Sequence, residues 1–130
     1  MAAIVRVRDV MKREIVSVDG MASAKEVAEQ MRSKRISEIL VARRHDDDAW
    51  GMVTITDLVE QVIVPGHDAG DVSAYEIMTK PIITVPANMD IRYAVRLMNM
   101  TSIKSAPVEE NGEVVGVVSL SSLVLDNNLL

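Results

Sequence analysis

The chain has 130 residues, 48% of them hydrophobic, so one compact domain can bury a sizeable core; with no Phe, one Trp and nine Met, that core must be aliphatic. The net charge of −5 and the scarcity of aromatic residues exclude a general nucleic-acid surface, which needs clustered Lys and Arg or stacking platforms. The chain has no cysteine, hence no disulfide, thiolate metal ligand or cysteine nucleophile. Because no apolar run approaches a membrane span and Arg6 interrupts any signal-peptide region, we expect a cytoplasmic protein with no membrane partner.

The first part of the chain reads as a strand followed by a helix. A turn over residues 8–11 precedes an expected strand at Ile15–Val18. Ser23 then has Glu26 at the spacing of a capping box. Apolar residues follow at helical spacing, namely Ala24, Val27, Ala28 and Met31. We therefore expect an amphipathic helix that begins after Ser23.

A β-hairpin and a second helix come next. The hairpin loop spans residues 43–49, and the strand beyond it ends at Thr54, whose hydroxyl can begin a helix. Asp57 lies three residues later, on the first turn of that helix, and Val64-Pro65-Gly66 stops it. The polar linker His67–Asp71 is too short to separate two free domains, so we expect both halves of the chain to pack as one unit.

The second half repeats this order of elements. A strand is expected at Ile82–Val85, Asp90 caps the next helix, and Asn111-Gly112 is the preferred filling of a type I′ hairpin turn. A shift of 67 residues places Val5, Met11, Ile15, Val18, Met31, Ile36 and Val41 on Val72, Met78, Ile82, Val85, Met98, Ile103 and Val108. A shift of 65 then places Gly51, Val53, Leu58 and Val59 on Gly116, Val118, Leu123 and Val124. We predict an α/β fold of two β-α-β-β-α repeats, residues 1–66 and 67–130, related by a pseudo-two-fold axis.

Two such repeats in tandem resemble the cystathionine-β-synthase (CBS) domain pair, or Bateman module. The residues that carry the resemblance are Asp9-Val-Met11, Glu76-Ile-Met-Thr-Lys-Pro81, Ala106-Pro-Val108 and the two strand-to-helix corners after Gly51 and Gly116. The resemblance implies a regulatory module that binds an adenosine-containing ligand between its repeats: AMP, ADP, ATP or S-adenosylmethionine. It also implies pairing into a homodimer.

The resemblance implies two unequal ligand clefts. The first would combine Thr54, Asp57, Thr79, Pro81, Ile83, Ile103, Ser37 and Glu38. In this cleft the Asp57 carboxylate would accept hydrogen bonds from both ribose hydroxyls. Glu38 lies where the family often has basic residues, and it would repel a phosphate chain.

The second cleft would combine Lys12, Val16, Ile36, Lys104, Ser119 and Ser122. Lys104 takes the phosphate position there. Ser122 replaces the ribose-binding acid, which disfavours nucleotide binding at this cleft.

Several of these candidate site residues and charged residues also have a purely structural interpretation. Thr54 with Asp57, and Ser119 with Ser122, also have the spacing of helix caps. His45-Asp46-Asp47-Asp48 is better interpreted as a solvated hairpin tip than as a metal site, because consecutive residues do not easily converge on one ion. Arg43 and Arg44 are interpreted as solvated charges, with a phosphate contact as the alternative.

The chain lacks the sequence features of an enzyme. It has no Walker-type loop, no dinucleotide fingerprint and no recognisable Ser-His-Asp setting, so we expect no catalytic residues, no metal and no cofactor. The leading hypothesis is a sensor that passes ligand occupancy to a separate effector protein. The alternative is a structural or interaction dimer whose clefts are vestigial, which Ser122 and Glu38 favour.

Overall fold

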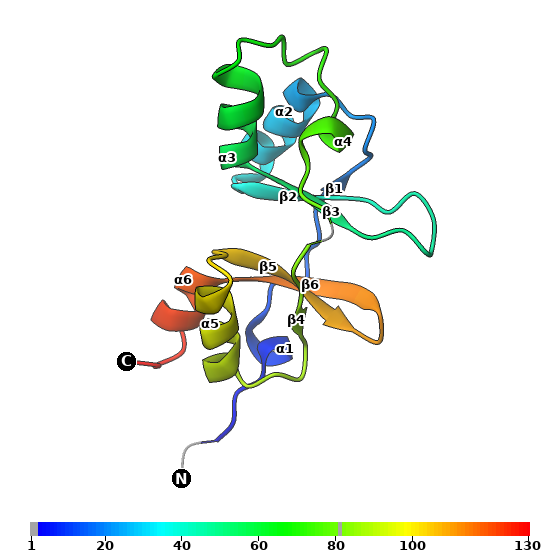
Figure 1. Cartoon of the computed structure of the whole chain (residues 1–130). Coiled ribbons are helices and arrows are strands. Elements are labelled where there is room, and N and C mark those ends of the chain that lie inside the picture. The colour runs from blue at the N-terminus through cyan, green and yellow to red at the C-terminus, as the bar shows by residue number, and fades with distance from the viewer. Residues whose placement is uncertain (1–2, 81) are drawn as a thin grey trace. The chain divides into compact units, whose positions relative to one another are not determined.

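The computed structural model describes residues 3–80 and 82–130, and within these the chain forms two compact units. Unit 1 contains the N-terminal segment up to Ile15 together with Ile83–Leu130, and unit 2 contains Val16–Ile82. In the described part of each unit, a three-stranded sheet packs against helices. The predicted α/β fold class is confirmed (Figure 1).

Unit 2 is built on the sheet β1-β2-β3. Strands β1 (Ser17–Val18) and β2 (Glu38–Val41) are parallel, and β3 (Gly51–Thr54) is antiparallel to β2. The helices α2 (Ala24–Lys34), α3 (Ile55–Leu58) and α4 (Ala74–Ile77), with the π-helix η1 (Val59–Ile63), lie on one face of this sheet (Figure 1). Their buried side chains form one aliphatic core with the strands, comprising Ala24, Val27, Met31, Ile39, Val41, Val53, Leu58, Val62, Ala74 and Ile77.

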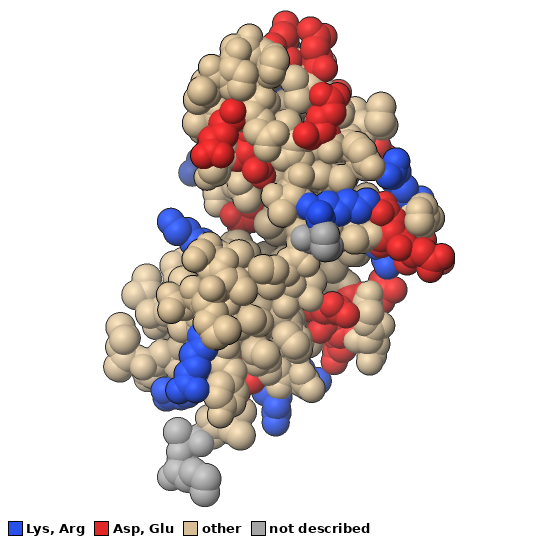
Figure 2. All heavy atoms as spheres, viewed as in Figure 1, with Lys and Arg blue, Asp and Glu red and all other residues tan. Residues whose placement is uncertain are grey.

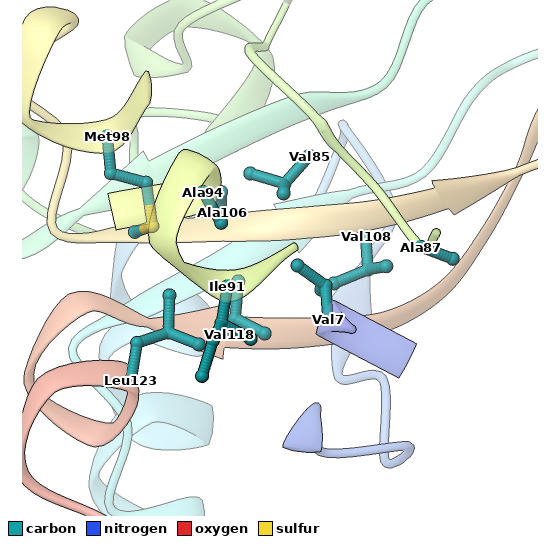
Figure 3. Close-up of a cluster of buried hydrophobic side chains, with 10 residues drawn as sticks. All are labelled: Val7, Val85, Ala87, Ile91, Ala94, Met98, Ala106, Val108, Val118 and Leu123. Atoms are coloured by element: carbon teal, nitrogen blue, oxygen red, sulfur yellow. The ribbon is translucent and has the colours of Figure 1, made fainter. Parts of the chain in front are cut away.

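Unit 1 repeats this arrangement on the sheet β4-β5-β6. Strands β4 (Val85–Pro86) and β5 (Ser105–Glu110) are parallel, and β6 (Glu113–Ser119) is antiparallel to β5. The helices α1 (Val7–Val10), α5 (Ile91–Met100) and α6 (Leu120–Leu125) contribute to its core. Figure 3 shows Met98, Ala94 and Ile91 of α5 beside Leu123 and Val118, with Val7 of α1 next to Val108.

The N-terminal segments of the two repeats are exchanged between the units. The backbone N–H of Val7 donates to Met89 O (2.9 Å), and that of Arg8 donates to Ala87 O (2.9 Å). In unit 2, the N–H of Ala74 donates to Ala22 O (2.7 Å) in the corresponding way. Val7 of α1 and Ala74 and Ile77 of α4 are buried in these positions. The compact units therefore differ from the sequence repeats 1–66 and 67–130. The first repeat supplies α1 to the core of unit 1, and the second repeat supplies α4 to the core of unit 2.

The caps and the tight turn follow the sequence predictions. Ser23 Oγ accepts from the N–H of Glu26 (3.1 Å), and Asp90 Oδ1 accepts from the N–H of Arg92 (2.9 Å). Asn111 and Gly112 have φ of 53° and 82°, which are both positive as a type I′ turn requires. These local signals were sufficient to place both helix starts and the hairpin.

The predicted strands at Ile15–Val18 and Ile82–Val85 need correction. The structure has only β1 (Ser17–Val18) and β4 (Val85–Pro86) there, because just two residues of each pair with the neighbouring parallel strand. The predicted turn at residues 8–11 is the single-turn helix α1, and the same position of the second half has the single-turn helix α4. The second helix of the first half begins at Ile55 as expected, but it changes to the π-helix η1 after one turn.

Candidate ligand-binding site

The corner between β3 and α3 is a reciprocal cap formed by Thr54 and Asp57. The N–H of Asp57 donates to Thr54 Oγ1 (3.2 Å), while the N–H of Thr54 donates to Asp57 Oδ2 (2.8 Å). The Thr54 hydroxyl also donates to Oδ2 (3.1 Å). Both side chains are half-buried. The capping interpretation of this pair is therefore confirmed, and the arrangement holds the carboxylate at the start of a helix.

Three other residues predicted for the first cleft lie around this corner. Glu38 is directly opposite Thr54 in the β2–β3 register, and the Ser37 hydroxyl donates to Glu38 Oε2 (2.8 Å). Thr79 lies on the other side of β3, where its N–H donates to Met52 O (2.9 Å) and its carbonyl accepts from Met52 N–H (3.0 Å). Met52 and Thr54 alternate with the buried Val53, so they share the sheet face turned away from the core. Unit 2 thus brings Ser37, Glu38, Thr54, Asp57 and Thr79 together.

This corner can accept hydrogen bonds from hydroxyl groups. Thr54 occupies Oδ2 of Asp57, and Oδ1 makes no hydrogen bond with any residue in the described ranges 3–80 and 82–130. A carboxylate has about four lone-pair positions, so the group retains acceptor capacity for a ligand diol. The exposed Thr79 side chain adds a further hydroxyl. The second carboxylate, from Glu38, makes the corner acidic and unfavourable for phosphate.

The equivalent corner of unit 1 has different chemistry. Ser119 Oγ accepts from the N–H of Ser122 (3.2 Å), which confirms the cap, but the Ser122 hydroxyl donates to Asp126 Oδ2 (3.0 Å). Lys12 exchanges two backbone hydrogen bonds with Val117 (2.9 and 2.8 Å), and Lys104 O accepts from the N–H of Leu120 (2.8 Å). Unit 1 thus brings Lys12 and Lys104 to the Ser119 corner.

The other predicted site residues are divided between the units. Ile83 and Ile103, assigned to the first cleft, belong to unit 1, whereas Val16 and Ile36, assigned to the second, belong to unit 2. Pro81 lies outside the described residues. The assignment of these residues to the clefts stays a prediction.

The sequence interpretation missed a cluster at the β2–β3 hairpin. The Arg44 guanidinium lies 4.4 Å from the centroid of the Tyr75 ring and donates to its hydroxyl (2.6 Å), so Arg44 is not simply a solvated charge. Lys80 forms an ion pair with Asp48, and Figure 2 shows acidic and basic side chains gathered around this loop. The missed signal was Tyr75, an aromatic residue at the position that Arg8 occupies under the 67-residue shift.

No three His, Asp or Glu side chains among residues 3–80 and 82–130 are placed to hold one ion. None of the helices described there is both long and apolar enough to cross a membrane.

Comparison with known proteins identifies the family. The model of the CBS domain family matches residues 7–64 and 72–125, so the chain belongs to the CBS domain family, as two repeats in tandem. The uncharacterized protein MK0525 of Methanopyrus kandleri is 31% identical over 121 residues, which are 92% of this chain and 61% of that protein. The chain thus spans less than two-thirds of the length of that relative.

Solved structures agree with the fold. The hexameric CBS-CP12 protein from bloom-forming cyanobacteria is 30% identical with a TM-score of 0.90, over 97% of this chain and 74% of that one. The CBS domain pair of protein MJ0100, in complex with 5′-methylthioadenosine and S-adenosylmethionine, is 20% identical with a TM-score of 0.80, over 93% of this chain and 94% of that one. The likeness to MJ0100 concerns the fold alone.

Proposed function

We propose that this CBS pair is a regulatory module that senses an adenosine-containing ligand through the Thr54–Asp57 corner and signals to a separate effector protein. The observation that carries the proposal is the half-buried Asp57 carboxylate. Its Oδ2 is fixed by Thr54, and its Oδ1 makes no hydrogen bond with the described residues. Charge-assisted hydrogen bonds from two ribose hydroxyls to such a preoriented carboxylate are stronger than neutral ones.

The fold relationship with MJ0100 supports this ligand class. That protein, which shares the fold, binds 5′-methylthioadenosine and S-adenosylmethionine. In this chain Thr79 pairs with Met52 of β3, two residues before Thr54, so a second hydroxyl flanks the same corner.

Glu38 decides which members of the class are favoured. Its position opposite Thr54 places a second carboxylate beside the proposed ribose site. Like charges repel, so each phosphate on the ligand lowers the expected affinity. We therefore propose AMP, ADP and ATP as weaker ligands than S-adenosylmethionine, whose sulfonium and ammonium groups are cationic.

The proposed stoichiometry is one adenosine ligand per chain. Ser122 takes the place of Asp57 in unit 1, and its hydroxyl is bonded to Asp126 instead. The backbones of Lys104 and Lys12 lie at that corner, where two lysine side chains would suit a phosphate better than a ribose. The same substitution of Ser122 for the acid favours the second candidate function, a structural dimer module without a ligand.

A thermal-shift and calorimetric titration separates the two functions. Adenosine, 5′-methylthioadenosine, S-adenosylmethionine, AMP and ATP are each added to the full chain. A ligand at 100 times its dissociation constant should stabilise the fold by about 2.7 kcal/mol, which raises the melting temperature measurably. Saturation at one ligand per chain supports the sensor. If none of the five ligands gives a shift or heat, the structural module is the better description.

A further inference from the structure

Unit 1 contains a polar cavity at the end of β5 that is remote from the Ser119 corner. The cavity has a volume of about 360 Å³, within the range of small-molecule sites, and its walls include Arg8, Thr84, Asn88, Glu109, Glu110 and Asn111. Ser105, at the other end of β5, pairs with Ser119. Glu110 is five positions after Ser105 along β5, a distance of about 17 Å, so the cavity and the corner are distinct places.

The β5–β6 ladder is irregular next to this cavity. Consecutive residues of a regular strand point to opposite faces of the sheet. Here the register shifts between Val108 and Glu109, because Val108 pairs with Gly116 but Glu109 pairs with Val114. The extra residue is Val115 of β6, and beyond it Glu109 and Glu110 pair with Val114 and Glu113 and both line the cavity.

Groups of both charges line this cavity. The Arg8 guanidinium lies 3.3 Å from Glu110 Oε1, and the Thr84 hydroxyl donates to Glu109 Oε2 (2.9 Å). Arg6 donates to the Asn88 carbonyl (2.6 Å) and so holds the loop at the cavity's edge. The side-chain amides of Asn88 and Asn111 make no hydrogen bond with any residue in the described ranges, which leaves two NH2 groups and two carbonyl oxygens for a ligand.

Unit 2 has a different arrangement at the equivalent position. Tyr75 replaces Arg8 there, and a Cβ on Gly20 would lie 3.4 Å from Tyr75 Cδ2, so the ring packs closely against this glycine. Arg44 covers the ring face at 4.4 Å. An aromatic ring and its stacked cation thus occupy the region where unit 1 has a hollow with charged walls.

We propose that the unit 1 cavity binds a basic α-amino acid, such as lysine or arginine. The Arg8 guanidinium matches a carboxylate through paired hydrogen bonds, and the two glutamates match the α-ammonium and the side-chain cation. Arg8, Glu109 and Glu110 together carry one net negative charge, and a basic amino acid carries one net positive charge. The asparagine amides add hydrogen bonds to the carboxylate and ammonium groups. This site is independent of the adenosine corner.

The test is a calorimetric titration of the full chain with L-lysine and L-arginine, alongside two analogues of lysine. Norleucine lacks the side-chain cation, and cadaverine lacks the carboxylate. Saturable binding of lysine or arginine is expected, with both analogues about tenfold weaker or worse, because each loses a charge-assisted contact. Cadaverine binding as tightly as lysine would overturn the proposal, since it would reveal only an acidic surface.

Three variants locate the binding. Glu110→Gln should weaken lysine at least about tenfold, and Arg8→Tyr, which introduces the residue of the equivalent position in unit 2, should abolish binding. Glu113→Gln is the matched control, because Glu113 begins β6 of the same hairpin but does not line the cavity. Circular dichroism checks that each variant is folded. The absence of saturable binding of lysine and arginine to the wild type, or binding unchanged by both Glu110→Gln and Arg8→Tyr, rejects the site.

Discussion

The carboxylate of Asp48 is paired with the ammonium of Lys80, which joins the β2–β3 hairpin loop to the segment that follows α4. Asp48 Oδ2 also accepts from the backbone N–H of Arg44 (3.0 Å), and Oδ1 accepts from the N–H of Ala49 (3.0 Å). Lys80 follows Thr79 directly, and Thr79 is bonded to β3. The ion pair therefore helps to hold a residue of the proposed adenosine site in position.

The first prediction concerns acid stability. Hydrogen bonding from the N–H of Arg44, then the bond with Lys80, hold the pKa of Asp48 well below its ordinary range. Because the pKa of Asp48 is lower in the folded than in the unfolded state, the ionised carboxylate stabilises the fold at pH values above the unfolded-state pKa, which is about 4. This stabilisation is lost as the pH falls below about 4. Asp48→Asn should therefore lower the melting temperature at pH 7 and flatten its decline between about pH 4 and pH 2. Equal slopes for wild type and variant in thermal melts would contradict the prediction.

The second prediction compares two equivalent glycines. A Cβ at Gly116 would lie 2.7 Å from the backbone carbonyl oxygen of Lys12, which has little freedom to move. At Gly51 the shortest approach is to the Met78 sulfur (2.5 Å), at the flexible end of a side chain, and the nearest backbone oxygen is at 3.4 Å. Gly116→Ala should cost about 1–3 kcal/mol of unfolding free energy, and Gly51→Ala distinctly less. Denaturant unfolding measures both, and a larger loss for Gly51→Ala would refute the argument.

Much of the fold could be predicted from local signals in the sequence. The caps at Ser23 and Asp90 and the turn at Asn111-Gly112 each depend on a few adjacent residues, and all three are confirmed. The 67-residue shift also aligned the two sets of core positions, because both repeats bury the same faces. These signals are short-range or repeated, so one sequence is sufficient to detect them.

The remaining features depend on contacts between distant residues. The exchange of α1 and α4 between the units leaves no periodic pattern, because each helix has a single turn. The Lys80–Asp48 pair joins residues 32 positions apart (80 − 48), and neither residue type signals its partner. In the same way, Asp126 lies outside the Ser119–Ser122 spacing, so its bond to Ser122 was not anticipated.

The third prediction is self-association. Ile55 and Ile63 remain 47% and 68% exposed on α3 and η1, and Leu125 remains 74% exposed at the end of α6. Exposed aliphatic side chains on adjacent helical turns favour a partner surface. Light scattering should give at least twice the 14.3 kDa chain mass at micromolar concentration. Ile63→Glu should shift the particle towards the monomer, with Glu60→Gln on the same π-helix as the control.

The fourth prediction concerns the charge of Glu38. If Glu38 repels phosphate at the proposed site, Glu38→Gln should raise the affinity for AMP and ATP and leave that for adenosine nearly unchanged. The effect should be larger for ATP than for AMP and should diminish at high salt, because screening weakens the repulsion. Calorimetry at two salt concentrations measures this. An equal change in the affinities for adenosine and ATP would show that Glu38 affects binding through packing and not through its charge.

The last prediction separates the two roles of Asp57. Asparagine keeps one carbonyl oxygen that can accept from the N–H and hydroxyl of Thr54, so Asp57→Asn should cost only about 0.3–1 kcal/mol of stability, in the range of helix-dipole effects. If the carboxylate also binds a ribose, the same change removes charge-assisted hydrogen bonds of about 1.5–3 kcal/mol, a roughly tenfold to hundredfold loss of affinity for adenosine. Asp90→Asn is the matched control, because Asp90 caps α5 through its bond to Arg92. Adenosine affinity that survives in folded Asp57→Asn would leave Asp57 with the helix cap alone.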